Sequence, residues 1–368
     1  MACRYCGGQY DLRPHLPPKD TSQSCLLSAL TRLRPQGTDV ASLRLSAVQR
    51  ELLRRFKCVL AGWDAPLVKI SGGEITLWDD TAAELARAAL AAGRRVQVLT
   101  NALAIGPSVL RVAHEHQDVH FQVSLDGVNH SSNRYRCPDL LAHRAVIRNI
   151  RLLCTLGRPV EVNMVLTNAN TGMLLEELRA MRDLGRVLVA PRPVRGRAAL
   201  DLCPTRAQVR EVDALIDAYE SLADSLPPLP YLVRLREILL GGRQEGTPCL
   251  VPWIVAGVEL RGNLKFCTTS DNSLPSEPLA FEYTSGSGYG ALRTLYCHAT
   301  AMRLPEYCRR CITQYEILGL YVEGAVSEDE LKRYPATWGP LAEHRLGVLR
   351  KAWSDQVGAR AVRTRLEG

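Results

Sequence analysis

Short apolar runs alternate with helix-like segments through the first half of the chain, and this alternation limits the possible folds more than any other feature. The runs are rich in Val, Leu and Ile, as buried strands are, and they span residues 66–71, 96–100, 119–125, 160–166 and 187–194. Segments with helical spacing of apolar residues lie between them, at residues 81–92, 108–116, 143–156 and 174–184. Asp80 is the predicted N-cap of the first of these helices. Strands that alternate with helices predict a parallel sheet joined by right-handed crossovers, either open or closed into a barrel.

Polar residues cluster where the predicted strands end. They occupy positions 71–74, 100–101, 124–126 and 167–168. In parallel α/β folds the loops that carry the chemistry follow the carboxyl ends of the strands. We therefore expect these four groups to lie on one rim of the sheet.

Composition excludes several classes of protein. The chain has 368 residues, of which 46% are hydrophobic and 23% charged, as in ordinary globular proteins. No apolar run approaches the roughly 18 residues of a membrane span, and the polar N-terminus does not resemble a signal peptide. We therefore expect a cytoplasmic protein with no membrane partner, whose twelve cysteines stay reduced and serve as metal ligands or core residues. Its four Phe are not interleaved with basic residues, which argues against a nucleic-acid partner.

The second half of the chain is organised differently. We predict a barrel-like domain over residues 1–200, a helical linker over 201–244, a small loop-rich domain over 245–325 and a basic helical tail over 326–368. The loop-rich domain holds five of the twelve cysteines: Cys249, Cys267, Cys297, Cys308 and Cys311. A unit this small and loop-rich lacks the core to stabilise itself, so a bound metal is expected.

Three motifs point to iron chemistry when they are taken together. The first is a Cys-x-x-Cys pair with an aromatic residue inside it, the second is a Gly-Gly-Glu sequence at the end of a predicted strand, and the third is the C-terminal cysteine set. Their residues are Cys3, Tyr5 and Cys6; Gly72, Gly73 and Glu74; and Cys249, Cys267, Cys308 and Cys311. In this combination the chain resembles the radical S-adenosylmethionine (SAM) enzymes, in the branch with a C-terminal SPASM or twitch domain. The resemblance implies a partial (β/α)6 TIM-like barrel plus a small iron–sulfur domain.

The N-terminal motif resembles the last two-thirds of the family's Cys-x3-Cys-x2-Cys signature, which holds a [4Fe–4S] cluster that binds SAM. Cys3 and Cys6 match the second and third cysteines, and Tyr5 matches the aromatic residue before the last one. The first cysteine would fall two positions before Met1, and the family's first barrel strand is missing as well. We expect a truncated N-terminus, and a chain with two of the three thiolates should bind this cluster poorly. Half of a zinc site, or a pair without a metal, is the alternative.

The resemblance also implies contacts to SAM. Gly72, Gly73 and Glu74 take the place of the motif that meets the amino group of SAM, and an ordinary turn between strand and helix is the alternative. Ser124 matches a residue that often reaches the ribose. Arg134, on the following loop, would meet the carboxylate of SAM or an anionic substrate, unless it is an ordinary surface residue.

The C-terminal cysteines match the twitch pattern. Cys249, Cys267 and the Cys308-x-x-Cys311 pair would supply four thiolates, enough to ligate one auxiliary [4Fe–4S] cluster. Residues 312–368 contain no cysteine, so a second auxiliary cluster is not expected. A zinc site with four thiolates is the alternative. Cys297 lies inside the motif as a substitute ligand or a bystander.

The resemblance implies an enzyme, an oxidoreductase or maturase, that cleaves SAM reductively and abstracts a hydrogen atom from its substrate. We expect oxidation or crosslinking of a ribosomally made peptide, with an external flavodoxin- or ferredoxin-type electron donor and a separate peptide-recognition protein. One alternative is a dehydrogenase or epimerase that acts on a sugar or another small natural-product intermediate. The other is a zinc-stabilised binding or scaffold protein without catalysis.

Overall fold

The computed structural model describes six main stretches of the chain, 46–62, 65–72, 74–194, 201–241, 311–313 and 315–333. It also describes three short strands, β6 (Gly257–Val258), β7 (Asn263–Lys265) and β8 (Glu277–Pro278). Most of the predicted metal ligands and part of the Gly-Gly-Glu motif lie outside the described residues. These are Cys3, Tyr5, Cys6, Gly73, Cys249, Cys267 and Cys308.

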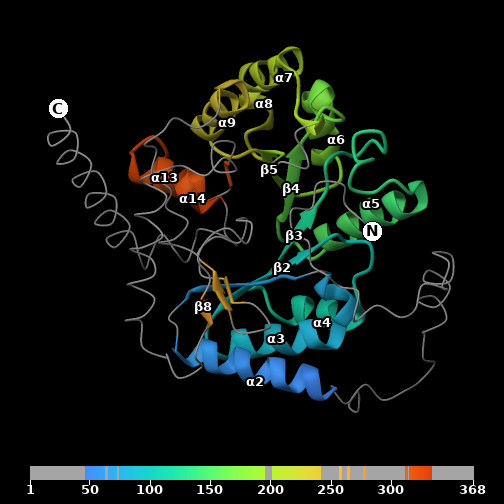
Figure 1. Cartoon of the computed structure of the whole chain (residues 1–368), viewed down its shortest axis with the longest axis vertical. Coiled ribbons are helices and arrows are strands. Elements are labelled where there is room, and N and C mark those ends of the chain that lie inside the picture. Colours follow the sequence, from blue (N-terminus) through green and yellow to red (C-terminus); the bar gives the residue numbers. More distant parts are fainter. Residues whose placement is uncertain are drawn as a thin grey trace, which may run out of the picture.

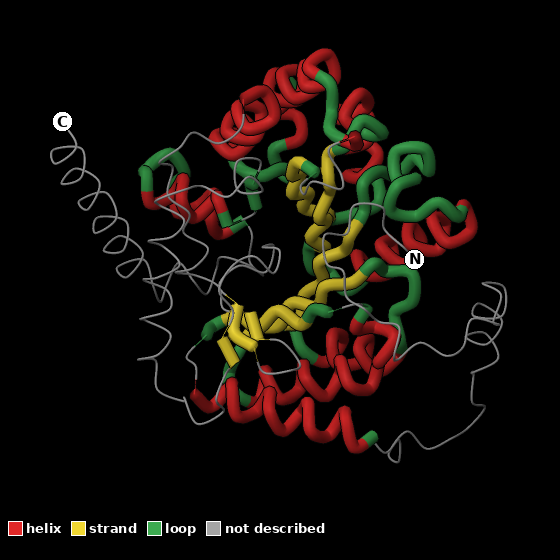
Figure 2. Tube along the Cα trace, viewed as in Figure 1, coloured by secondary structure: helices red, strands yellow, loops and turns green. Residues whose placement is uncertain are grey.

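A parallel sheet of five strands forms the centre of the protein (Figure 1). The strands follow chain order across the sheet: β1 (Leu67–Ile70), β2 (Arg95–Thr100), β3 (Val119–Ser124), β4 (Val160–Leu166) and β5 (Val187–Pro193). Each pairs in parallel with the next. The sheet curves, with helices along its outer side, as in part of a TIM-like barrel (Figure 2). This confirms the predicted α/β class.

Helices link the strands and cover the outer face of the sheet. In chain order they are α3 (Asp79–Ala91), α4 (Pro107–Glu115), α5 (Leu140–Cys154) and α6 (Leu174–Arg182). A further helix, α2 (Ala47–Gly62), precedes β1 and packs against α3. None of the helices in the described part of the chain has both the length and the apolar character needed to span a bilayer.

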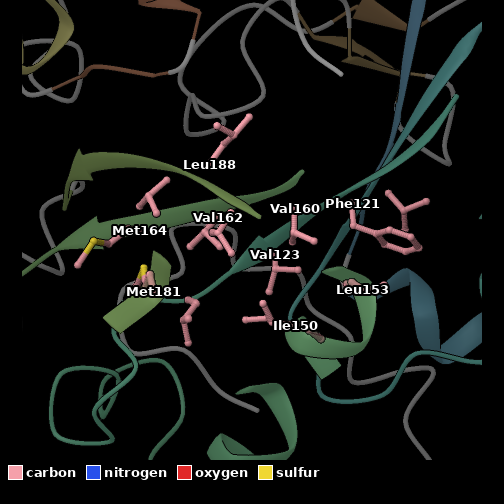
Figure 3. Close-up of a cluster of buried hydrophobic side chains, with 14 of the residues drawn as sticks. Phe121, Val123, Ile150, Leu153, Val160, Val162, Met164, Met181 and Leu188 are labelled. Atoms are coloured by element: carbon pink, nitrogen blue, oxygen red, sulfur yellow. The ribbon is translucent and has the colours of Figure 1, made fainter. Parts of the chain in front are cut away.

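The outer face of the sheet is apolar. Strand residues such as Val123, Val162 and Met164 are completely buried, and they pack with Ile150 of α5 and Met181 of α6 (Figure 3). Burying each side chain of this size stabilises the fold by about 1.5–3 kcal/mol relative to exposure. The outer face therefore provides most of the cohesion between sheet and helices.

The inner, concave face carries the opposite set of residues and is more polar. Successive strand residues point to opposite faces, and partners in a parallel register share a face. Lys69 lies beside Gln97, and Gln97 lies beside His120. Towards the carboxyl ends, Ser124 lies beside Asn163. The polar residues of β1 to β4 thus gather inside the partial barrel.

The chain after β5 folds onto the same core. Its helices are α7 (Arg206–Asp217), α8 (Tyr219–Leu222) and α9 (Leu229–Gly241), and later α13 (Glu316–Val322) and α14 (Glu328–Lys332). Tyr231 of α9 is buried, and its hydroxyl donates to the carbonyl oxygen of Pro191 at 2.9 Å. Arg234 of α9 pairs with Glu316 and Glu323, which attaches α13 to α9.

The segment predicted to be loop-rich contains regular structure. β6, β7 and β8 form a small antiparallel sheet in which Gly257 pairs with Lys265 and Asn263 pairs with Pro278. Strands of two or three residues are too short to produce a recognisable period in the sequence.

Candidate functional site

The carboxyl ends of β1 and β2 are joined through Glu74. Its Oε1 accepts hydrogen bonds from the hydroxyls of Thr76 and Thr100, at 2.6 and 2.7 Å. Its Oε2 accepts from the backbone N–H of Asn101 at 2.7 Å. Glu74 also precedes the short 3-10 helix η2 (Ile75–Trp78) and caps it by accepting from the N–H of Thr76. The carboxylate is half-buried, so it is held in place while it still faces the rim of the sheet.

The turn before Glu74 leaves backbone accessible. Gly72 has φ +130°, a conformation that residues with a side chain rarely adopt. A Cβ added to Gly72 would meet nothing within 4 Å. The requirement for glycine here therefore comes from the backbone conformation and not from crowding, and open space adjoins the turn.

Ser124 and Asn163 form a polar pair at the ends of β3 and β4. They are register partners on the inner face, and both are half-buried. Among the described residues the Ser124 hydroxyl makes no hydrogen bond, and the Oδ1 atom of Asn163 is buried without a partner. A buried acceptor without a donor costs about 1–3 kcal/mol. The pair is therefore suited to a ligand that carries hydroxyl groups.

Asp126 fixes the loop that follows β3. It is 1% exposed, and its Oδ1 accepts from the guanidinium of Arg136 and from the backbone N–H of Val165, both at 2.9 Å. Burial raises the pKa of Asp126, and Arg136 acts in the opposite direction. The side chain of Asn170 donates to the backbone oxygens of Asp126 and Val165. These bonds connect the ends of β3 and β4 and hold the backbone next to Ser124.

A second buried carboxylate holds the other side of that loop. Glu177 of α6 is 0% exposed and accepts from the backbone N–H groups of Val128 and Asn129. His143 of α5 is within hydrogen-bond distance of the carbonyl oxygen of Val128, at 2.7 Å, and burial lowers its pKa. Buried side chains from two helices, α5 and α6, thus hold the loop after β3 against the core.

Arg134 lies on the exposed part of this loop. Its guanidinium donates to the carbonyl oxygen of Ser131 at 3.3 Å and to the hydroxyl of Tyr135 at 3.4 Å, and it lies 4.9 Å from the centre of the Tyr135 ring. The buried arginine of the loop is Arg136, which the sequence did not single out.

A row of polar residues crosses the inner face deeper in the barrel. Lys69, Gln97 and His120 occupy matching positions on β1, β2 and β3. The ammonium of Lys69, both amide atoms of Gln97 and Nδ1 of His120 are buried without hydrogen-bond partners in the described part of the chain. Burial, followed by the charges of Arg95 and Arg158, lowers the pKa of His120 to about 4. His120 is therefore neutral at neutral pH.

The residues that sequence reasoning missed, Asn163 and this row, do leave a signal. β2, β3 and β4 read RVQVLT, VHFQVS and VEVNMVL, in which apolar and polar residues alternate. Strands buried on two apolar faces are instead nearly continuous in their hydrophobicity. The alternation therefore indicates a polar inner face.

The segment that begins at Cys311 lies against the inner face. Cys311 is half-buried and is followed by the buried residues Ile312 and Thr313. The ring of Tyr315 lies 4.9 Å from the ammonium of Lys69. Within the described stretches no three His, Cys, Asp or Glu side chains come together as a metal site. The predicted partners of Cys311 all lie outside those stretches.

The amino-acid sequence identifies the family. Residues 1–184, half of the chain, match the profile of the Radical SAM superfamily. The chain therefore belongs to the radical SAM superfamily. No curated protein sequence matches the chain at a significant level.

Solved structures of the same fold include two named proteins. Streptococcus suis SuiB has a TM-score of 0.51 and 15% sequence identity, over 70% of this chain and 66% of SuiB. anSMEcpe with bound AdoMet (SAM) has a TM-score of 0.50 and 13% identity, over 86% of this chain and 93% of anSMEcpe. The chain thus spans just under two thirds of the length of SuiB. At such low identity these likenesses establish the fold alone.

Proposed function

We propose that this protein is an enzyme that cleaves SAM reductively and removes a hydrogen atom from a peptide substrate. The observation that carries the proposal is that Glu74, Ser124 and Asn163 place hydrogen-bonding atoms at the carboxyl edge of the sheet. They do so in a chain of the radical SAM superfamily. When bound, a [4Fe–4S] cluster would supply the electron for the reductive cleavage of SAM, the chemistry needed to abstract hydrogen from an unactivated C–H bond. The protein binds the reactants, orients them and excludes water.

The ammonium and ribose groups of SAM have chemically suitable partners on this edge. Oε2 of Glu74 accepts one hydrogen bond from the described residues and can accept another, and the negative charge of Glu74 suits the ammonium group of SAM. The backbone of Gly72 allows a close approach beside it, and Gly73 is proposed to take part in the same contact. Ser124 and Asn163 suit the ribose hydroxyls, since the buried Oδ1 of Asn163 needs a donor.

Charged and metal-binding groups complete the proposed site. Arg134 is the proposed contact for the SAM carboxylate or for a substrate anion. Cys3 and Cys6 are the proposed thiolate ligands of the SAM-binding cluster, with Tyr5 beside them. For the auxiliary [4Fe–4S] cluster of a SPASM or twitch domain, the proposed ligands are Cys249, Cys267, Cys308 and Cys311. The position of Cys311 before Tyr315 supports an auxiliary cluster near the inner face of β1.

A peptide substrate is favoured by two observations. The inner face offers amide and ammonium groups that match peptide chemistry. A structure of the same fold, anSMEcpe with bound AdoMet and the Kp18Cys peptide, has a TM-score of 0.50 over 82% of this chain. We therefore propose oxidation or crosslinking of a ribosomally made peptide in a natural-product pathway. An external flavodoxin- or ferredoxin-type donor supplies electrons, and a separate protein presents the peptide.

The test is anaerobic reconstitution, with iron and sulfide, of the chain extended to carry a third cysteine two positions before Met1, followed by SAM and dithionite. The expected product is 5′-deoxyadenosine, formed together with methionine. Cys3→Ser and Cys6→Ser should abolish this product, whereas Cys308→Ser should lower the iron content and leave part of the SAM cleavage intact. Cys58→Ser, on the outer helix α2, is the matched control and should change neither. A protein that retains zinc, binds no iron and forms no 5′-deoxyadenosine would instead be a scaffold.

A further inference from the structure

The polar row inside the barrel contains four side-chain atoms that have no hydrogen-bond partner in the described part of the chain. They belong to three residues on adjacent strands, Lys69, Gln97 and His120, which are side by side in the parallel register. Gln97 is 0% exposed, and neither its amide nitrogen nor its amide oxygen is hydrogen-bonded to any residue that the structure describes. Buried polar atoms with unmet hydrogen bonds on three neighbouring residues are unusual, since nearly all buried polar groups in native proteins are satisfied. Within the described residues, the row therefore has hydrogen-bonding capacity for a bound group.

The charges of the row indicate which kind of chemical group would bind there. Among the described residues the buried ammonium of Lys69 has no carboxylate paired to it, and it lies 4.9 Å from the centre of the Tyr315 ring. Next along the row, Gln97 offers an N–H donor, and the neutral ring of His120 follows it. Of the acids nearby in the described residues, Glu161 lies two strands from Gln97 and accepts from Gln122, and Asp118 pairs with Arg95. The row thus presents one positive charge and neutral hydrogen-bonding groups.

We infer that Lys69 and Gln97 form a specificity subsite for the carboxylate side chain of an acidic residue in the peptide substrate. One carboxylate oxygen accepts from the Lys69 ammonium and the other from the Gln97 amide, an arrangement of charge-assisted hydrogen bonds. This inference rests on the proposed function, because it assigns the substrate class of the same barrel.

The depth of the row agrees with such a role. Lys69 precedes Gly72 by three residues, and strands rise about 3.3 Å per residue, so the row lies roughly 10 Å below the edge where SAM is proposed to bind. A side chain anchored there would keep its own backbone towards that edge. The subsite would thus orient the substrate without occupying the position of SAM.

A binding experiment tests the subsite with two probe peptides. They are acetyl-Gly-Gly-Glu-Gly-Gly-amide and its Gln counterpart, titrated calorimetrically into the reconstituted, SAM-bound protein without oxygen. The wild type should bind the Glu peptide at least tenfold more tightly. Lys69→Met should remove this preference and leave the affinity for the Gln peptide within about twofold. Lys57→Met, at an exposed site on α2, is the matched control and should keep the preference.

Thermal unfolding distinguishes a ligand-binding role from a structural one. A buried ammonium without a counter-charge destabilises the ligand-free protein, so Lys69→Met should raise the unfolding midpoint. A lower midpoint would mean that Lys69 serves the fold through Tyr315 and would overturn the inference. So would a wild type that does not discriminate between the peptides, or a Lys69→Met variant that weakens both equally. Gln97→Leu provides a second variant and should also raise the midpoint and reduce the preference.

Failure of the subsite can be told apart from failure of the proposed function. If 5′-deoxyadenosine forms without charge selectivity for the peptides, the function stands and the subsite is wrong. If the peptides are discriminated but no 5′-deoxyadenosine forms, the subsite stands and the proposed function is wrong.

Discussion

Glu74 at the end of β1 accepts a hydrogen bond from the backbone N–H of Asn101 at the end of β2, with 2.7 Å between the nitrogen and Oε2. The same carboxylate accepts from the hydroxyls of Thr76 and Thr100. One side chain therefore joins two strand ends and also places a negative charge at the rim of the sheet. A substitution can separate these two roles, because a neutral amide can keep the hydrogen bonds between the strand ends but carries no negative charge.

Glu74→Gln is expected to keep the fold and to weaken SAM binding. The amide oxygen can accept from Asn101 N–H, and the amide nitrogen can donate to the threonine hydroxyls, which are able to accept. Stability should therefore change by less than about 1 kcal/mol. The lost charge should reduce SAM affinity about tenfold, measured by anaerobic titration. Glu74→Ala removes both roles and should lower stability as well. Unchanged SAM affinity in both variants would exclude Glu74 from the site.

Asp126→Asn is expected to destabilise the protein by about 3 kcal/mol, because removing one partner of a buried ion pair leaves a buried charge poorly compensated. Here the charge is that of Arg136, whose guanidinium lies 2.9 Å from Asp126 and whose side chain is 12% exposed. Urea unfolding measures the loss. Asp118→Asn is the matched control, since the pair of Asp118 with Arg95 is exposed and should contribute less than about 1 kcal/mol. Equal losses in both variants would contradict the buried-pair explanation.

Much of the sheet could be predicted from the sequence. The predicted strand over residues 160–166 coincides with β4, and the one over 119–125 ends one residue beyond β3. The outer face of the sheet is buried against helices, which requires apolar side chains at fixed intervals. The spacing of apolar residues in the sequence therefore predicts the strands. The positions of Gly72, Glu74 and Ser124 at strand ends follow from the same pattern.

Contacts between segments distant in the chain could not be predicted. The sequence predicts Asp80 as the N-cap of the helix after β1, yet α3 begins at Asp79, after Trp78. The carboxylate of Asp79 instead accepts from the backbone N–H groups of Ser108 and Val109, at the start of α4. A carboxylate is equally favourable at either helix start, so tertiary packing decides between them. The hydrogen-bond partners of Glu74 and Asp126 likewise could not be predicted from the sequence, because tertiary packing brings them together from distant parts of the chain.

Asn163→Leu is expected to stabilise the ligand-free protein and to weaken SAM binding. The Oδ1 atom of Asn163 is buried without a donor, so its removal should gain about 1 kcal/mol. The proposed ribose contact would be lost, and SAM affinity should fall about tenfold. Asn149→Leu is the contrast, because the amide of Asn149 donates to the carbonyl oxygens of Ala102 and Leu103 and its loss should destabilise. An Asn163→Leu variant that binds SAM normally would remove Asn163 from the site.

The stability of the protein is expected to fall between pH 7 and pH 5 because of His120. Its pKa is lowered from 6.5 to about 4 in the folded state, mainly by burial and then by Arg95 and Arg158. As the pH falls below 6.5, the unfolded chain takes up a proton that the folded protein resists, so unfolding becomes easier. A shift of this size corresponds to about 2 kcal/mol at pH 5 and approaches about 3 kcal/mol near pH 4.

Urea unfolding at pH 7 and pH 5 measures this effect as a difference between variants. His120→Gln cannot take up the proton, so its loss of stability between the two pH values should be about 2 kcal/mol smaller than that of the wild type. His114→Gln, at an exposed position on α4, should lose as much as the wild type. If His120→Gln and the wild type lose the same amount, His120 is protonated as readily in the folded protein as in the unfolded chain. The inner face of the barrel would then be open to water at this position.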